Sequence, residues 1–221
     1  MLQSTHFQFL EAIKNNNNRE WFHDHKDEFS TIQTQVKQFF VEIYDELCKT
    51  DSLEAIKHYR IYRDVRFSND KTPYNHHLSV SFSRTKPLLR GGYYLHISPE
   101  SIFTGGGFWE PNPADLQRIR KEFELDDAEI RKIIADKNFI KHFKNLQGDE
   151  VKTAPKGFDK NHPAIDLIKK KQFIVSEQFT LEEALSGNFK EKVVDSFRAM
   201  RPFFDYMSDV LSTDTNGNPI Y

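Results

Sequence analysis

Residues 78–107 read LSVSFSRTKPLLRGGYYLHISPESIFTGGG, and this stretch decides the fold. It holds two runs in which apolar and polar side chains alternate, with apolar residues at Leu78, Val80, Phe82, Tyr93, Leu95 and Ile97. A period of two is typical of a β-strand with one packed and one more polar face. A third short run over 101–104 follows a Pro-Glu turn. Because so few residues separate the runs, no crossover helix fits between them, and an antiparallel sheet is predicted.

Two further segments extend this sheet. Residues 59–67 alternate in the same way, and residues 172–179 have the composition of another strand. In the first segment, parity places Arg63 on the apolar face and puts on the polar face Arg60, Tyr62, Asp64 and Arg66. An arginine in an apolar row needs a carboxylate or carbonyl partner, because an unpaired buried charge is very costly. Two interpretations of Arg63 remain open: a buried structural ion pair with an acidic helix residue, or an anion-binding arginine at the floor of a pocket.

Helices are predicted on both sides of the strand block, where apolar residues recur every three or four positions. They cover approximately residues 5–14, 24–49, 113–123, 127–143, 163–170 and 189–211. Thr180 and Glu183 form a capping-box pattern for one more short helix. With no repeat or linker in the chain, the sequence predicts one α+β domain over 1–212. Its antiparallel sheet has four to five strands flanked by helices, and residues 213–221 form a turn-like tail.

Composition excludes several classes of protein. The chain has 221 residues, of which 38% are apolar and 29% charged, as in an ordinary water-soluble domain. No window approaches the ~20 apolar residues of a membrane span, and the first residues lack the pattern of a secretory signal. Cys48 is the single cysteine and stands in an apolar-rich stretch, so it is expected to be a buried packing thiol without a disulfide. These features predict a cytoplasmic protein.

Charge is unevenly distributed along the chain. Residues 57–90 hold eight Lys and Arg against two Asp, a net charge of +6, so the other residues carry −8 within the total of −2. A mildly acidic total argues against general nucleic-acid binding. A local basic block favours a specific small anionic or phosphorylated ligand.

The polar face of the predicted sheet supplies a candidate site for that ligand. If the strands are neighbours, basic and aromatic side chains gather there, and the candidate ligand-binding residues are Arg60, Arg66, Lys71, Tyr94 and His96. Guanidinium groups match phosphate or carboxylate geometry, and aromatic rings stack on planar groups. A solvated outer sheet face produces the same pattern, so both interpretations remain open. The glycines at 105–107 predict a bulge or tight bend with at least one positive φ.

Two other function classes remain open beside the binding module. One is an enzyme in which His96 acts as general acid or base beside Asp64 and Tyr94. The other is a protein-interaction domain without a small-molecule pocket. No metal site is predicted, because the nine histidines lack metal-ligand spacing, and no cofactor is predicted, because 105–107 lack dinucleotide-binding spacing. The sequence leaves the oligomeric state open.

Several blocks of the chain resemble one known family. They are NREWF at 18–22, DVRFSNDKTPY at 64–74, GYYLHI at 92–97, GGGFW at 105–109 and GFDKNHP at 157–163. In this order, over about residues 5–210, they resemble the domain of unknown function 2461 family of conserved hypothetical proteins, mostly bacterial. The resemblance implies a single α+β domain. It implies no established activity, cofactor or catalytic residue.

Overall fold

The computed structural model describes residues 1–214 and 216–220. Its centre is a five-stranded sheet in which each strand pairs with the next one along the chain, all antiparallel. The strands are β1 (Leu53–His58), β2 (Leu78–Arg84), β3 (Gly92–Ile97), β4 (Ile102–Phe108) and β5 (Phe173–Phe179). This confirms the predicted single α+β domain with an antiparallel sheet.

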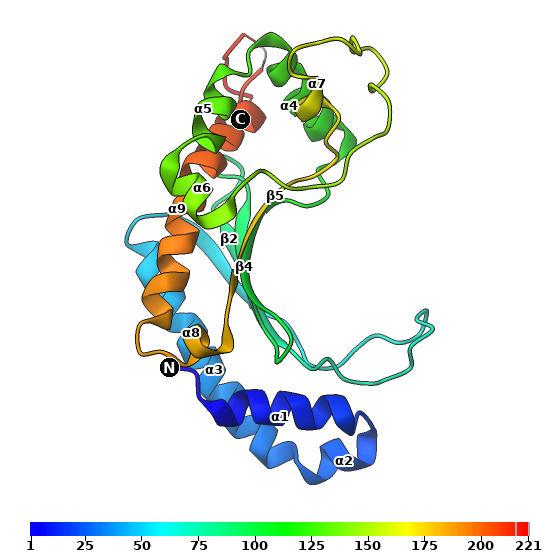
Figure 1. Cartoon of the computed structure of the whole chain (residues 1–221), viewed down its shortest axis with the longest axis vertical. Coiled ribbons are helices and arrows are strands. Elements are labelled where there is room, and N and C mark those ends of the chain that lie inside the picture. Colours follow the sequence, from blue (N-terminus) through cyan, green and yellow to red (C-terminus); the bar gives the residue numbers. More distant parts are fainter. Residues whose placement is uncertain (215, 221) are drawn as a thin grey trace.

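Helices precede the sheet, fill the long connection from β4 to β5 and end the chain. They are α1 (Ser4–Asn15), α2 (Arg19–Asp24), α3 (Lys26–Cys48), α4 (Pro113–Leu125), α5 (Ala128–Ile134), α6 (Lys137–Phe143), α7 (Ile165–Ile168), α8 (Leu181–Leu185) and α9 (Phe189–Ser212). Figure 1 shows α3 and α9 along one face of the sheet, on its left, with α1 and α2 at the lower end and α4 to α7 at the upper end. The opposite face of the sheet is left concave and open between these two ends.

The packed face of the sheet lies against the two long helices. α3 contacts β1 and β2, while α9 contacts β4. Aromatic rings fill this layer. For example, the ring centroid of Tyr93 lies 5.1 Å from that of Phe197 and 5.2 Å from that of Phe204. Aromatic residues bury large areas, so this layer supplies much of the hydrophobic stabilisation. The alternation in β2 and β3 correctly identified its members Val80 and Leu95, which are fully buried.

A charged residue also points into the packed face. Arg84 is 1% exposed, and its Nε lies 2.9 Å from the carboxylate of Asp51, itself buried in the turn after α3. The guanidinium also pairs with Asp205 on α9, and the Tyr93 hydroxyl donates to Asp51. Arg84 has the same strand parity as the buried Val80, so alternation along β2 correctly places Arg84 in the core. The buried charge predicted from the sequence was Arg63 instead.

The predicted strand over 59–67 is wrong. β1 lies earlier in the chain, and residues 59–77 form an arm that projects past the edge of the sheet, the teal loop in Figure 1. The arm folds back on itself through a bridge between Tyr62 and Tyr74. Alternation failed because the arm is not part of the sheet, so its apolar residues have no common packed face: Ile61 is buried, whereas Phe67 is 95% exposed.

Arg63 therefore does not point into the core as predicted. Its side chain is 25% exposed and pairs with Asp70 in the same arm, at 2.5 Å from Nη1 to Oδ2. Nη1 also donates to the carbonyl of Thr72 at 3.1 Å. The expected carboxylate partner is Asp70, but this ion pair lies within the arm and not in the hydrophobic core.

Two smaller corrections concern the helices, and the tail contains a turn. The helix predicted over 127–143 is two helices, because Asp136 caps α6 through the amide of Asn138. Cys48 ends α3 on the solvent side and is exposed, contrary to the expectation of a buried thiol. In the tail, Asp214 accepts bonds from the amides of Asn216 and Asn218 in a turn. Residues 215 and 221 of the predicted tail lie outside the described residues.

The glycine run is part of β4 and has the predicted positive φ. Gly107 adopts φ +130°, and a Cβ there would lie 2.1 Å from the Phe173 carbonyl oxygen. At Gly106, a Cβ would meet the Met200 sulfur and the Phe204 ring at 2.7 Å. Only glycine suits these positions, because Gly107 has a left-handed backbone and Gly106 lets α9 approach the sheet closely.

Replacing Arg84 by Met is expected to lower the free energy of unfolding by about 3–5 kcal/mol, because it leaves the buried Asp51 carboxylate without its main partner. Arg66→Met, which breaks an exposed pair in the arm, is the matched control and should change stability little. Urea unfolding of both variants measures the difference. Equal stabilities would show that the buried network does not stabilise the sheet.

Candidate functional site

A hollow of about 1060 Å³ lies over the open face of the sheet. Strand pairing aligns one residue from each strand across this face, in the row Lys57, Ser81, Tyr94, Gly105 and Ser176. A second row on the same face contains Ser79, His96, Phe103 and Gln178. The polar face predicted from alternation therefore exists, and Tyr94 and His96 lie on it.

The floor of the hollow is low because one position in the middle of its first row has no side chain. A Cβ on Gly105 would meet the Phe103 ring and the Val175 carbonyl oxygen at 3.7 Å, an ordinary van der Waals contact, so the position could hold a side chain that glycine leaves out. Aromatic rings stand around this floor. Tyr94 lies 5.8 Å from both Tyr59 and Phe103 between ring centroids, and Trp109, at the rim, is 64% exposed. Such rings offer faces on which a planar or apolar ligand surface stacks.

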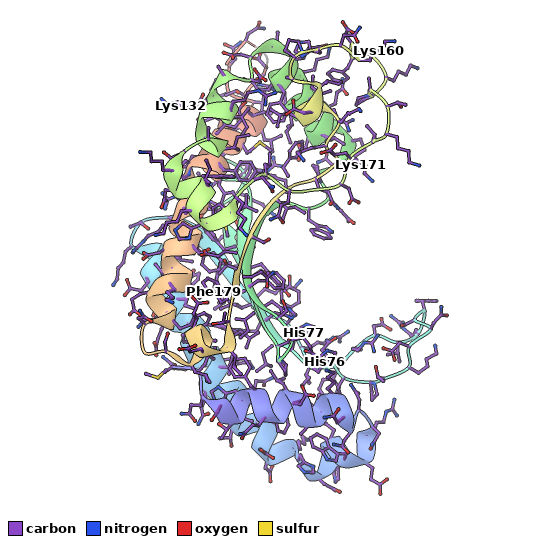
Figure 2. All side chains as sticks on the ribbon, in the orientation of Figure 1. His76, His77, Lys132, Lys160, Lys171 and Phe179 are labelled. Carbon is purple, nitrogen blue, oxygen red and sulfur yellow. The ribbon has the colours of Figure 1, made fainter. Side chains whose placement is uncertain are left out.

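The polar groups of the hollow are mostly neutral. Ser176 on β5 donates to the side-chain oxygen of Gln147 at 3.0 Å, and Gln178 on the same strand accepts from Ser101 at 3.3 Å. Asp149 is the one charged residue among the described lining, and Lys171 lies 3.6 Å from its carboxylate. Figure 2 shows Lys171 at the upper end of the open face. Hydroxyls and amides that both donate and accept suit a hydrogen-bonding ligand without formal charge.

His96 stands at the other end of the open face, in an aromatic setting. Its ring stacks on Phe103 at 4.9 Å and lies 4.5 Å from the ring of His77, and its Nδ1 is 3.3 Å from the Tyr94 hydroxyl. Burial, with a smaller contribution from the neighbouring His77, lowers the pKa of His96 to about 4. His96 is therefore neutral at pH 7. Figure 2 shows His76 and His77 where the arm leaves the sheet.

The other predicted site residues lie in the arm. Arg66 pairs with Asp64 at 2.7 Å, and the Nζ of Lys71 donates to the carbonyl of Val65 at 3.0 Å. Arg60 follows β1 and is exposed. Hydrogen bonds from Arg66 hold the pKa of the Asp64 carboxyl below its usual range. The structure thus brings Tyr94 and His96 together, but it leaves Arg60, Arg66 and Lys71 outside the hollow, and Asp64 beside Arg66.

Sequence reasoning missed several residues of the hollow. Ser176 and Gln178 share the parity of Ile174 in β5, so alternation would have found them. Gln147 gave no such signal, because it lies in the loop after α6. It reaches the sheet by pairing with Ile174, which donates its amide to the Gln147 carbonyl at 3.0 Å. Such a contact between a loop and a distant strand has no local pattern.

Two kinds of feature are absent from the described part of the chain. Residues 1–214 and 216–220 contain no group of three or more His, Cys, Asp or Glu arranged to hold a metal ion. Among the same residues, no helix combines the length and the apolar character that a membrane crossing requires.

Comparison with known proteins gives one match. The model of a conserved hypothetical protein family, DUF2461, matches residues 5–206. The chain belongs to this family. The resemblance of its sequence blocks is thereby confirmed, and the match covers the sheet, the arm and most of α9. A search of curated proteins and a search of solved structures each find no match.

The low pKa of His96 makes stability depend on pH. Between pH 4 and the ordinary histidine pKa of about 6.5, the unfolded chain binds a proton at this site that the folded chain does not, so stability rises with pH across this window. In His96→Gln, the fall in Tm from pH 7 to pH 4.5 should be smaller than in the wild type. Burial also lowers the pKa of His77, so part of the pH dependence of stability remains in this variant.

The exposed His23 supplies the control, and His23→Gln should show the acid sensitivity of the wild type. Scanning calorimetry at both pH values measures the difference. The same pH dependence in His96→Gln and the wild type would contradict the neutral, buried state of His96.

Proposed function

We propose that this protein binds a small ligand in the hollow over its open sheet face. The observation that carries the proposal is the hollow itself, which combines a glycine floor, aromatic walls and neutral hydrogen-bonding groups within about 1060 Å³. This volume is at the upper end of small-molecule sites, and few polar groups among aromatic ones are typical of them. The ligand has a planar or apolar ring face and several hydroxyl or amide groups, and is the size of a nucleoside or a disaccharide.

The charge of the lining favours an uncharged ligand over the anionic one expected from the sequence. Asp149 would repel an anion, and the cations predicted to hold it, Arg60, Arg66 and Lys71, lie in the arm. Lys57 belongs to the same row of the sheet as Tyr94 and Gly105. However, its Nζ lies 4.9 Å from the centre of the Tyr59 ring and makes a cation–π contact there. Hydrogen bonds and stacking therefore supply the affinity.

The environment of His96 favours binding over the enzyme alternative. A general base works best with a pKa near the working pH, whereas burial holds that of His96 at about 4. The proposed partner Asp64 is ion-paired in the arm. His96 packs on Phe103 and hydrogen-bonds Tyr94, so its role in the proposal is to fix two aromatic residues of the hollow.

Gly105→Val tests the site, because it adds a side chain to the floor at a position where a Cβ meets no atom closer than 3.7 Å. A panel of nucleosides and disaccharides is screened by thermal shift. A ligand present at 100 times its Kd is expected to raise the wild-type Tm by about 5–10 °C. Gly105→Val should lose this gain while keeping its unliganded Tm, since valine is favoured in strands.

The matched control is Gly187→Val, whose added Cβ meets nothing within 4 Å and lies outside the hollow. It should respond as the wild type does. A ligand that stabilises the wild type and Gly105→Val equally would show that binding takes place elsewhere. Mass spectrometry of the denatured wild-type protein then identifies any compound that co-purifies with it.

A further inference from the structure

A second, smaller hollow lies between the arm and the helices at the N-terminal end of the chain. We propose that this hollow, the arm pocket, binds a phosphate monoester whose organic group contains a planar ring. It measures about 380 Å³ and is formed by α2, the start of α3 and both sides of the arm. It shares no lining residue with the hollow over the sheet, so the two sites are separate.

The base of the arm pocket is aromatic and held in place. Phe22 and Tyr74 are buried and stack at 4.1 Å between ring centroids, and Tyr62 approaches Phe22 edge-on at 5.8 Å. Asn17 fastens the arm to the helices by bonding both the amide and the carbonyl of Tyr74, at 3.1 and 2.8 Å. Tyr62 is 50% exposed, so its ring offers a face to a ligand. This arrangement suits stacking with a planar group.

The walls of the arm pocket are cationic. Arg19 and Lys26 come from the helices and Arg63 from the arm, and the lining contains no acidic side chain. The ion pairs of this region within the described residues are Arg63 with Asp70 and Arg66 with Asp64, which leaves Arg19 and Lys26 without a carboxylate. An anion between them would relieve the repulsion among these like charges.

Arg63 explains why a phosphate fits better than a diffuse negative charge. Its guanidinium is fixed by Asp70 and by the Thr72 carbonyl, so it is held in place before a ligand arrives. A guanidinium presents planar, paired donors that match phosphate oxygens, whereas Lys26 contributes a mobile point charge. Phosphate at the cations and a ring on Tyr62 together account for the size and the composition of the pocket. Two kinds of ligand combine a phosphate monoester with a planar ring: a mononucleotide and a phosphorylated aromatic side chain.

Calorimetric titration in low-salt buffer tests the proposal with AMP and phenyl phosphate as probes. Adenosine, ribose 5-phosphate and inorganic phosphate each lack one half of the proposed chemistry. We expect AMP or phenyl phosphate to bind at least about tenfold more tightly than all three, and added salt to weaken binding because the cations are exposed. Tighter binding of AMP indicates a nucleotide, and tighter binding of phenyl phosphate a phosphorylated aromatic side chain.

Variants locate the site. Lys26→Gln and Arg19→Gln should each weaken the tighter probe by about tenfold, the effect of one charge-assisted hydrogen bond. Tyr62→Ala should reduce the affinity for AMP to that for ribose 5-phosphate. Lys160→Gln removes the same charge at the far end of the molecule, as Figure 2 shows, and should leave binding unchanged. These side chains are exposed, so none of the variants is expected to impair folding.

Gly105→Val separates this proposal from the proposed function, because it fills the other hollow and should retain full affinity for the probe. The proposal is overturned if AMP and phenyl phosphate bind no more tightly than inorganic phosphate. It is also overturned if Lys26→Gln and Arg19→Gln bind as tightly as Lys160→Gln.

Discussion

The buried guanidinium of Arg84 is the constraint on which the sheet and its covering helix depend. A charge that is 1% exposed must be paired, and its partners come from three places: Asp51 after α3, the Arg90 carbonyl before β3, and Asp205 on α9. These partners are far apart in the sequence. The network is therefore satisfied only when α3, the β2–β3 hairpin and α9 are all in their native places, so it favours one arrangement of the packed layer over others.

Because both long helices lie on one face of the sheet, no helix or strand of residues 1–214 and 216–220 forms a layer over the opposite face. Sheets of this kind usually expose such a face to water, and the alternating serines of β2 agree with that. Here the ends of the molecule extend beyond the sheet on this side, with α1, α2 and the arm at one end and the loops around α4 and α7 at the other (Figure 1). The open face thus becomes the floor of a hollow.

The two proposed sites divide the chemistry that the sequence had placed together. Neutral and aromatic groups lie on the sheet, with Tyr94 in the centre, whereas the cations belong to the arm and the adjoining helices. Of the cations predicted to bind an anion on the sheet, Arg60, Arg66 and Lys71 lie in the arm, outside the hollow over the sheet. Arg63, predicted to point into the core, lines the arm pocket together with Arg19, which is distant in sequence.

The sequence by itself determined the α+β class, the antiparallel order of β2 to β4 and the polar character of their open face, because a period of two is a local property of each strand. It could not distinguish the arm from a strand, since residues 59–67 alternate as well, and only the tertiary structure shows that Ile61 is buried while Phe67 is 95% exposed. Only the tertiary structure decided which side chains meet. Gln147 pairs with β5, Arg84 pairs with Asp205, and Arg19 lines the same pocket as Arg63, because the tertiary structure joins segments whose distance in the sequence leaves no periodic pattern.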